Sequence, residues 1–433
     1  MDPMDAMKIT EVLNDDYYDN NDTSITSNKV KNNNEINYVN NPIDKSHTIF
    51  ITKSGAFINF NQLTNNGELL DEEKKLKIVK KIENYFTMHS MQLIGAMKQI
   101  KTCKVDKKKE RIIIPRFGVF EILTNKYGLN IKNGYGTKMQ IEEGNKLSNP
   151  FVWKGVLTHN QTIISTHLLK NIYNDERKKC GSAGCILNLE AGQGKSYLAT
   201  YLMSIFQKKT AIIVHSTSLL MQWEKVIKNC YGDSITVGYY YSKKKKDGDI
   251  IIMVINSATC DSFSFKNNEN EIITMEPINY FNQFGFIIYD ECHTYANKFA
   301  GKALKIAQAP YMLGLSATPD ENINKFDKMV WWSLGGVICA DKLDGFIGTT
   351  GEFTATIHRI MYYGQAKYTK MLVNESTDMV SISQTINMVC DDDFRSDVIL
   401  YCIKQCMKKK LYTFVFADRR DYLTKLQKKL SDN

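Results

Sequence analysis

The 433-residue sequence lacks any long run of apolar residues. Its longest runs, such as Ile250–Ile255 and Phe284–Tyr289, fall short of the roughly 18–20 residues that a membrane helix needs. The first residues also lack a basic segment followed by an apolar stretch, so we expect no secretory signal. From these two observations we expect an intracellular protein without a membrane partner.

The ten cysteines include no Cys-x-x-Cys pair. The closest pairs, Cys180/Cys185 and Cys402/Cys406, have no partner pair at the spacing of a zinc ribbon. In a chain of this size without a visible secretory signal, we expect reduced and mostly buried thiols rather than disulfides or metal ligands.

Positive charge is in excess, and it is unevenly spread. The net charge is +9, but seven acidic residues and Lys8 give residues 1–23 a charge of −6, so the other residues carry +15. A basic body of this kind suits a polyanionic partner such as nucleic acid. A lysine-rich, AT-biased genome would produce the same excess, so charge alone leaves both interpretations open.

The composition predicts a polar N-terminal tail followed by a folded region. The hydrophobic and charged fractions, 43% and 24%, are those of an ordinary globular protein. Residues 1–46 are rich in Asn and Asp, and we expect this segment to be disordered. Residues 47–148 predict a small α+β domain without a recognisable chemical motif. Its expected elements are strands at 48–51, 56–60, 111–115 and 118–123 and a helix at 71–88.

Residues 149–322 alternate buried strands with helices. This alternation predicts a doubly wound α/β domain with a parallel sheet covered on both faces. In such a domain, functional groups lie at the carboxyl ends of the strands. The expected strands are 185–189, 211–215, 249–255, 284–289 and 311–315, and the expected helices are 161–173, 195–207, 218–229 and 296–308.

A glycine-rich segment follows the first of these strands and precedes a helix. Glycines let the backbone turn its N–H groups toward a phosphate, Lys195 would reach the outer phosphates of ATP, and the Ser196 hydroxyl would coordinate Mg²⁺. Leu189 stands where the full motif has its first glycine. The residues predicted to bind ATP here are Ala191, Gly192, Gln193, Gly194, Lys195 and Ser196.

Two further strand ends carry reactive side chains. After strand 284–289, Asp290 would hold Mg²⁺ and Glu291 would activate the attacking water. His293 is interpreted as a residue that couples this site to the next motif. That motif follows strand 311–315, where we expect Ser316, Ala317 and Thr318 to sense the γ-phosphate.

The segments Gly192–Ser196, Asp290–His293 and Ser316–Pro319, in this order and on strand ends, resemble superfamily 2 helicases of the DExH type. The resemblance implies a RecA-like motor lobe that uses ATP and Mg²⁺. It also implies that Gln161 faces the adenine base and that four hydroxyl residues, Ser216, Ser218, Ser257 and Thr259, contact nucleic acid. Trp223 is expected only to pack in the core.

The closest similarity is to the branch that contains the repair and transcription-factor DNA helicases and the poxvirus transcript-release helicase. It implies an ATP-dependent helicase or translocase in transcription or repair, with DNA favoured over RNA and with transcription machinery as a further partner. A member from a large DNA virus would work in the host cytoplasm or the virion. A P-loop kinase or transporter ATPase is disfavoured by the Ser-Ala-Thr-Pro element.

Residues 323–390 resemble a linker, and residues 391–433 resemble the start of a second, incomplete RecA-like lobe with a strand at Tyr412–Ala417. No segment matches the helicase motif that supplies an arginine finger. The sequence therefore predicts a truncated motor, a split gene or a degenerate copy. The alternative function is a module that binds nucleotide and nucleic acid without turnover.

Overall fold

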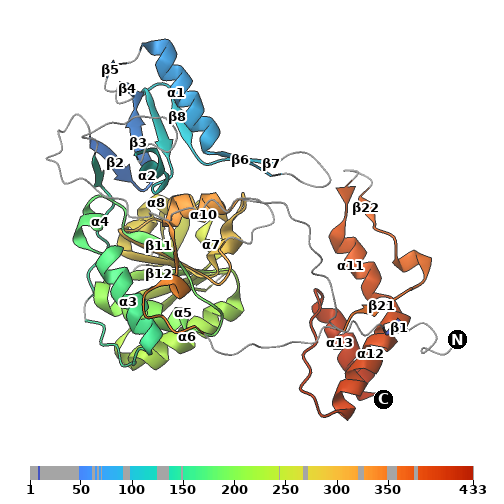
Figure 1. Cartoon of the computed structure of the whole chain (residues 1–433). Coiled ribbons are helices and arrows are strands. Elements are labelled where there is room, and N and C mark those ends of the chain that lie inside the picture. Colours follow the sequence, from blue (N-terminus) through green and yellow to red (C-terminus); the bar gives the residue numbers. More distant parts are fainter. Residues whose placement is uncertain are drawn as a thin grey trace, which may run out of the picture. The chain divides into compact units, whose positions relative to one another are not determined.

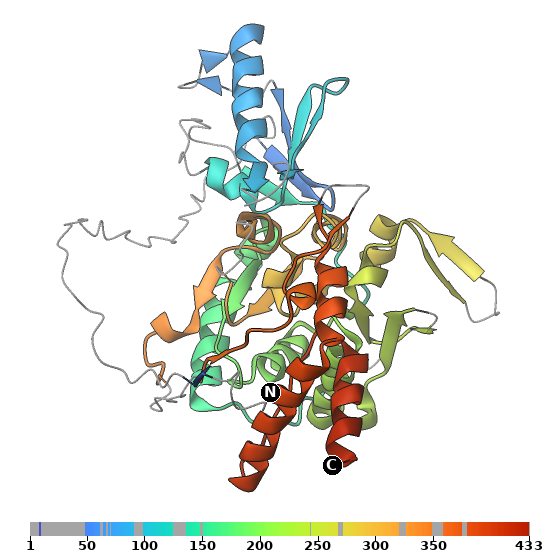
Figure 2. The same cartoon turned by 90° about the vertical axis from the view of Figure 1, so that its right-hand side faces the viewer.

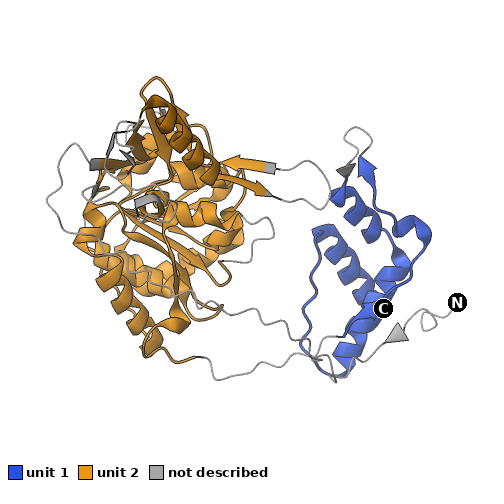
Figure 3. Cartoon of the chain, turned by 45° about the horizontal axis from the view of Figure 1, so that its top comes forward, with its two compact units in different colours: residues 1–31, 350–433 blue, residues 32–349 orange. Residues whose placement is uncertain are grey.

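The computed structural model describes residues 8–9, 48–60, 64–65, 68–69, 71–90, 98–123, 136–147, 150–242, 244–266, 272–319, 326–348, 358–374 and 379–432. The chain divides into two compact units, residues 32–349 and residues 1–31 with 350–433 (Figure 3). Most of the tail predicted at 1–46 lies outside the described residues.

An eight-stranded sheet forms the centre of the larger unit (Figure 1). All neighbouring strands in it are parallel except β13 and β14, which are antiparallel. This is the doubly wound parallel sheet of a RecA-like lobe, as the alternation of strands and helices predicts. The spatial order is β14 (Lys244–Lys246), β13 (Val237–Tyr241), β15 (Ile250–Val254), β12 (Thr210–Val214), β18 (Phe286–Tyr289), β19 (Tyr311–Ser316), β11 (Gly184–Asn188) and β20 (Val337–Cys339).

Helices cover both faces of this sheet, because side chains alternate between the faces along each strand. On one face, Leu187, Ile212 and Ile288 pack with α3, α5 and α6. On the other face, Ile213 and Ile287 pack in a core that includes α9 and α10. The helices of this part are α3 (His159–Asn171), α4 (Asp175–Lys179), α5 (Lys195–Phe206), α6 (Thr217–Tyr231), α7 (Ile255–Ala258), α8 (Pro277–Tyr280), α9 (Gly301–Ile306) and α10 (Asp327–Leu334). In addition, β16 (Phe263–Lys266) pairs antiparallel with β17 (Ile272–Met275).

The five predicted strands and the helices α3, α5 and α6 are confirmed within a few residues. Three further strands of the eight-stranded sheet, β13, β14 and β20, were not predicted, and β20 lies beyond the predicted domain boundary. β20 pairs in parallel with β11, so the sheet continues past residue 322 into the segment predicted to be a linker. The helix predicted at 296–308 is wrong in its first half, because a short 3₁₀ helix at Cys292–Tyr295 precedes the shorter α9.

A smaller sheet precedes the motor lobe and confirms the α+β prediction for this region. Its order is β10, β2, β3, β9, β8, and α1 begins after Asp71, whose side chain accepts a hydrogen bond from the Lys74 N–H as an N-cap. The elements are β2 (Thr48–Thr52), β3 (Gly55–Asn59), β8 (Lys104–Asp106), β9 (Arg111–Ile114), β10 (Gly136–Met139), α1 (Glu72–Tyr85) and α2 (Gly118–Leu123), with the short pairs β4 (Thr64–Asn65) and β5 (Glu68–Leu69), and β6 (Thr87–Ser90) and β7 (Lys98–Lys101).

Residues 118–123 are a helix, so the strand predicted there is wrong. Their β-branched and aromatic composition favours a strand, but tertiary context overrides such a preference. The Gly118 N–H donates to the Pro115 carbonyl and starts a turn, which buries Val119 and Phe120. A Cβ atom at position 118 would lie 2.5 Å from the Phe86 ring, so only glycine fits this approach.

Arg116 connects the smaller sheet to the motor lobe. Its side chain is 2% exposed, and its guanidinium donates to three backbone carbonyls, those of Gly181, Ala309 and Pro310. Burial lowers the pKa of Arg116 below its ordinary value. Its planar set of donors matches several acceptors at once, which the single ammonium group of lysine does not.

Arg116→Met should therefore lower the free energy of unfolding by roughly 2–4 kcal/mol, because buried carbonyls lose their donors. Arg116→Lys should recover only part of this loss. Denaturant unfolding followed by tryptophan fluorescence measures both variants, and equal stability of Arg116→Met and the parent would contradict the assigned role.

The unit that contains residues 358–432 is mainly helical. Helices α12 and α13, the red helices in Figure 2, pack together through Leu400, Tyr422 and Leu426. The elements are α11 (Ile382–Cys390), α12 (Asp393–Lys408), α13 (Arg420–Ser431), β22 (Val373–Asn374) paired with β23 (Met379–Val380), and β1 (Lys8–Ile9) paired with β21 (Ile360–Met361).

The strand predicted at Tyr412–Ala417 is not formed. A strand is stable only when its backbone pairs with a neighbour, and no pairing partner for this segment occurs among the described residues. Tyr412, Phe414 and Phe416 are instead exposed. Among the described residues, no helix is long and apolar enough to cross a membrane.

Candidate nucleotide-binding site

Four neighbouring strands bring the predicted motifs to one edge of the sheet. β11, β19, β18 and β12 lie side by side and parallel, so the segments that follow them emerge at the same edge. The phosphate loop follows β11, the acidic residues follow β18, and Ser316 ends β19. The Leu189 N–H donates to the Ser316 carbonyl, which joins the phosphate loop to the third motif directly.

The phosphate loop turns on two glycines in the left-handed conformation. Gly192 and Gly194 have φ values of 79° and 78°, which side chains with a Cβ rarely adopt. Gly194 is the residue before α5, so the free N–H groups of the first helical turn face the loop. The Lys195 ammonium donates to the Leu189 carbonyl at 2.9 Å and lies 3.5 Å from the Glu190 carbonyl.

This loop has the properties that a triphosphate requires. Ala191 and Gly192 are exposed, while Gln193 and Ser196 are half-buried in the loop and the first turn of α5. N–H groups at a helix start, a lysine and a hydroxyl together provide anion and Mg²⁺ ligands. The donor set therefore fits ATP with Mg²⁺.

Gln161 lies beneath the loop rather than on its surface. Its side chain is 5% exposed, its Nε2 donates to the Gln193 carbonyl at 3.4 Å, and its Oε1 accepts from the Thr158 N–H at 3.0 Å. Together with the Thr158 hydroxyl it forms a capping box at the start of α3. In this position Gln161 supports the loop, and contact with an adenine base stays a prediction.

Asp290 is held at three points. Its backbone N–H donates to the Ile213 carbonyl at 3.0 Å, its Oδ1 accepts from the Glu291 N–H at 3.1 Å, and its Oδ2 accepts from the Trp223 indole at 2.7 Å. Burial raises the pKa of Asp290, whereas the indole hydrogen bond and the Lys195 charge act in the opposite direction. A carboxylate held in this way is suited to bind a divalent cation.

Glu291 has an unusual backbone conformation, with φ 47°. Residues other than glycine seldom occupy this left-handed region, and such strain is concentrated at functional sites. The turn separates the two carboxylates: Asp290 is buried, while Glu291 is half-buried, with Oε2 lying 3.6 Å from the His293 Nδ1. The partial exposure leaves Glu291 accessible to water.

His293 contacts the motif that follows β19. Its Nδ1 lies 2.9 Å from the Ser316 hydroxyl, which in turn accepts a hydrogen bond from the Thr318 N–H at 3.1 Å. Ala317 and Thr318 are half-buried beside this chain of contacts. These contacts therefore join the segment after β18 to the Ser-Ala-Thr segment, and the predicted coupling role of these residues stays a prediction.

The four predicted nucleic-acid contacts differ in accessibility. Ser218 is exposed, and its hydroxyl lies 2.8 Å from that of Ser216, which caps α6 by accepting from the Leu219 N–H. Ser257 is half-buried. Thr259 is 5% exposed, and its hydroxyl donates to the Ile255 and Asn256 carbonyls of its own helix. The Thr259 hydroxyl is thus occupied by backbone acceptors in this structure, and its contact with nucleic acid, like those of Ser216, Ser218 and Ser257, stays a prediction.

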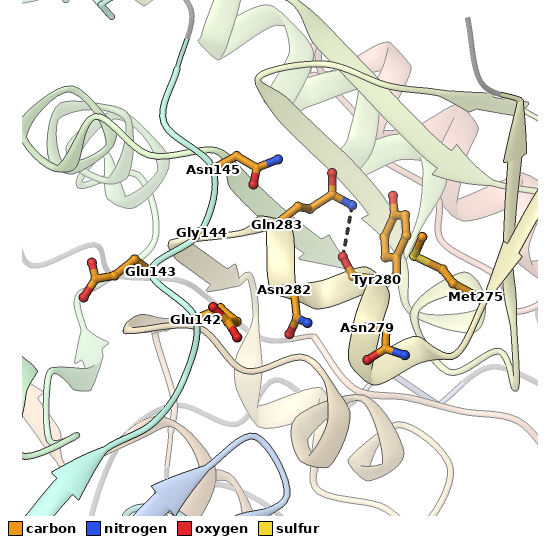
Figure 4. A pocket seen from close by; sticks show the side chains of 9 residues that line it. All are labelled: Glu142, Glu143, Gly144, Asn145, Met275, Asn279, Tyr280, Asn282 and Gln283. Carbon is orange, nitrogen blue, oxygen red and sulfur yellow. Dashed lines mark hydrogen bonds between the residues drawn. The ribbon is translucent and has the colours of Figure 1, made fainter. Parts of the chain in front are cut away.

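Figure 4 shows a separate cavity of about 430 Å³ next to the segment that leads into β18. Gln283 lies three residues before that strand begins, so the cavity is at the amino end of β18, opposite the phosphate loop. It takes no part in the arrangement described above. Its lining residues are Glu142, Glu143, Gly144, Asn145, Met275, Asn279, Tyr280, Asn282 and Gln283.

The strain at Glu291 predicts an inverted preference for glycine. Glu291→Gly should have a free energy of unfolding about 1 kcal/mol larger than that of Glu291→Ala, because a Cβ is unfavourable at positive φ. Exposed Lys225, within α6, provides the matched control, since alanine should there be more stable than glycine. Denaturant unfolding midpoints compare the alanine and glycine variants at each position. If Glu291→Ala were more stable than Glu291→Gly, the proposed backbone strain at Glu291 would be refuted.

Comparisons with known proteins agree with these motifs. Residues 154–321 match the family model named "Type III restriction enzyme, res subunit". An African swine fever virus protein named "Putative ATP-dependent RNA helicase QP509L" is 25% identical over 245 residues, which cover 55% of this chain and 42% of that protein. The DNA 3′-5′ translocase XPB2 of Sulfurisphaera tokodaii is 27% identical over 143 residues, covering 33% of this chain and 28% of its own length.

The matched parts are limited in extent. The chain spans less than half the length of the curated relatives that it matches. The UvsW helicase of bacteriophage T4 is a structural neighbour at 16% identity, with 62% of this chain and 94% of that chain covered and a TM-score of 0.39. Residues 154–321 therefore resemble the ATP-binding domain of superfamily 2 helicases, the family that the sequence motifs indicate.

Proposed function

We propose that this chain is an ATP-dependent motor that hydrolyses ATP with Mg²⁺ and moves along nucleic acid. The observation that supports this proposal best is the hydrogen bond between His293 and Ser316. It connects the acidic residues of the nucleotide site to a segment on the next strand, so a change at one motif can reach the other. A simple nucleotide-binding protein has no need of this connection.

The chemistry requires few groups, and the roles follow from their positions. Lys195 and the N–H groups of the loop would hold the phosphates, and Ser196 and Asp290 would hold Mg²⁺. Mg²⁺, when bound, neutralises phosphate charge. Glu291 would orient the water and accept its proton, while Ser216, Ser218 and Ser257 would contact the backbone of the strand.

DNA is the favoured strand, with RNA as the alternative, and the wider role proposed is in transcription or repair. The names of the viral RNA helicase and the archaeal DNA translocase leave both strands in consideration. Relatives from African swine fever virus and from the mimivirus of Acanthamoeba polyphaga support a source in a large DNA virus. Such a source would place the protein in the host cytoplasm or the virion, with transcription machinery as a partner. Steady-state ATPase assays with single-stranded DNA, duplex DNA and RNA compare the candidate substrates.

A second candidate function is a module that binds nucleotide and nucleic acid without turnover. It is favoured by one feature of the site: every nucleotide-contacting group proposed above comes from one sheet edge and its flanking helices. Such groups suffice for binding. If the chain binds ATP but does not hydrolyse it in the presence of DNA or RNA, this module is favoured over the motor.

Lys195→Ala should weaken ATP binding and abolish hydrolysis, because it removes the cation that faces the phosphates. Glu291→Gln should leave ATP binding nearly intact and lower hydrolysis by at least 100-fold, since an amide cannot accept the proton. Calorimetric ATP titration and phosphate release measure the two effects separately. Lys170→Ala, on the exposed end of α3, is the control, and equal loss of binding and turnover in Glu291→Gln would count against its role.

Removal of the contact between motifs should uncouple the motor. Both His293→Ala and Ser316→Ala should keep ATP binding but reduce the stimulation of ATPase activity by nucleic acid. Because the two side chains share one contact, the double variant should lose little more than either single variant. Additive losses in the stimulation factor would show that the two residues act independently.

A further inference from the structure

Trp223 has a polar contact that its buried position does not require. The side chain is 1% exposed and belongs to the core between α6 and the sheet, as expected for a packing residue. Its indole Nε1, however, donates at 2.7 Å to Oδ2 of Asp290, 67 residues further along the chain. Phenylalanine would fill much of the same volume but would not supply this hydrogen bond.

The contact determines how the Asp290 carboxylate is presented. Oδ1 accepts from the Glu291 N–H and Oδ2 accepts from Trp223, so each oxygen is held by one donor. A carboxylate has about four lone-pair sites, and the remaining ones stay free for a cation. Hydrogen bonds to a metal-binding carboxylate orient it, and their loss commonly lowers metal affinity by about 10–100-fold.

We propose that Trp223 is a positioning residue for Mg²⁺ binding: its indole N–H fixes the orientation in which Asp290 meets the cation of bound ATP. This inference rests on the proposed function, since it assigns Mg²⁺ to Asp290. Trp223 does not touch the nucleotide, and it acts only through the carboxylate.

Helix α6 gives this contact a second consequence. The helix begins at Thr217, next to the candidate strand contact Ser216, and carries Trp223 less than two turns later. One rigid element thus connects a possible nucleic-acid contact with the orientation of Asp290. A rotation of α6 on strand binding would move the indole and the carboxylate together.

Trp332 provides a matched control within the same unit. It is also 1% exposed, but its Nε1 has no hydrogen-bond partner among the described residues. It packs against Tyr85 and Phe86 of the smaller sheet's region. Tryptophan-to-phenylalanine substitutions at the two positions therefore remove similar volumes, whereas only the change at position 223 removes a hydrogen bond to Asp290.

The test measures ATP affinity in the presence and absence of Mg²⁺. The full chain carries Glu291→Gln so that ATP is not hydrolysed, and calorimetry is performed with Mg²⁺ and with EDTA. Trp223→Phe should reduce the Mg²⁺-dependent gain in ATP affinity by roughly 10-fold and leave the affinity in EDTA unchanged. Trp332→Phe should leave both affinities unchanged, and Trp223→Phe should add nothing in a background of Asp290→Ala.

Three other results have distinct meanings. An unchanged Mg²⁺-dependent gain in Trp223→Phe would overturn the positioning role and leave the proposed function standing. An equal loss with Mg²⁺ and with EDTA would also overturn it, because this indicates a structural role alone. Absence of any Mg²⁺-dependent gain in the parent would instead refute the Mg²⁺ site, and with it the basis of the inference.

A measurement on the parent protein covers the case in which Trp223→Phe does not fold. The chain has four tryptophans, so the ¹⁵N-indole resonance of Trp223 can be assigned by substituting the other three. Addition of Mg²⁺ to the ADP-bound protein should shift this resonance and leave that of Trp332 in place. A Trp223 resonance that does not respond to Mg²⁺ would refute the proposal.

Discussion

Parallel pairing of β12, β18, β19 and β11 is the constraint on which the candidate site depends. The register places Asn188 opposite Ser316 and Ile213 opposite Tyr289, so the segments that follow these strands meet at one edge. Residues more than a hundred positions apart thereby become neighbours. Backbone hydrogen bonds from Leu189 to Ser316 and from Asp290 to Ile213 continue the pairing beyond the strands and hold the loops.

The charged groups at this edge of the sheet, Asp290 and Lys195, are influenced by burial and by their neighbours. Burial raises the pKa of Asp290, and the hydrogen bond from the Trp223 indole and the charge of Lys195 act in the opposite direction. The Lys195 ammonium donates to backbone carbonyls next to the loop, and the oxygens of a bound phosphate could take the place of these carbonyls as acceptors. The hydrogen bonds thus fix both the Asp290 carboxylate and the Lys195 ammonium at this edge of the sheet, in keeping with the preorganisation that phosphoryl transfer requires.

The smaller sheet is attached to the motor lobe through a different kind of contact. Arg116 places a buried cation among three backbone carbonyls. Two of these carbonyls, from Ala309 and Pro310, immediately precede β19. Arg116 therefore braces the start of the strand whose other end carries Ser316, so the stability of the attachment and the position of the third motif depend on the same strand.

The sequence by itself determined the elements whose signals are local. Buried apolar runs predicted five strands of the motor sheet, and glycines with Lys195 predicted the phosphate loop, because periodicity and turn chemistry are properties of neighbouring residues. Only the tertiary structure decided the features that depend on distant partners. β20 required the register of β11, residues 118–123 became a helix in their packed surroundings, and Tyr412–Ala417 formed no strand without a neighbour. The hydrogen bond from Trp223 to Asp290 belongs to the same class: a tryptophan on the apolar face of an amphipathic helix predicts packing, and the acceptor of its N–H is known only when the chain has folded.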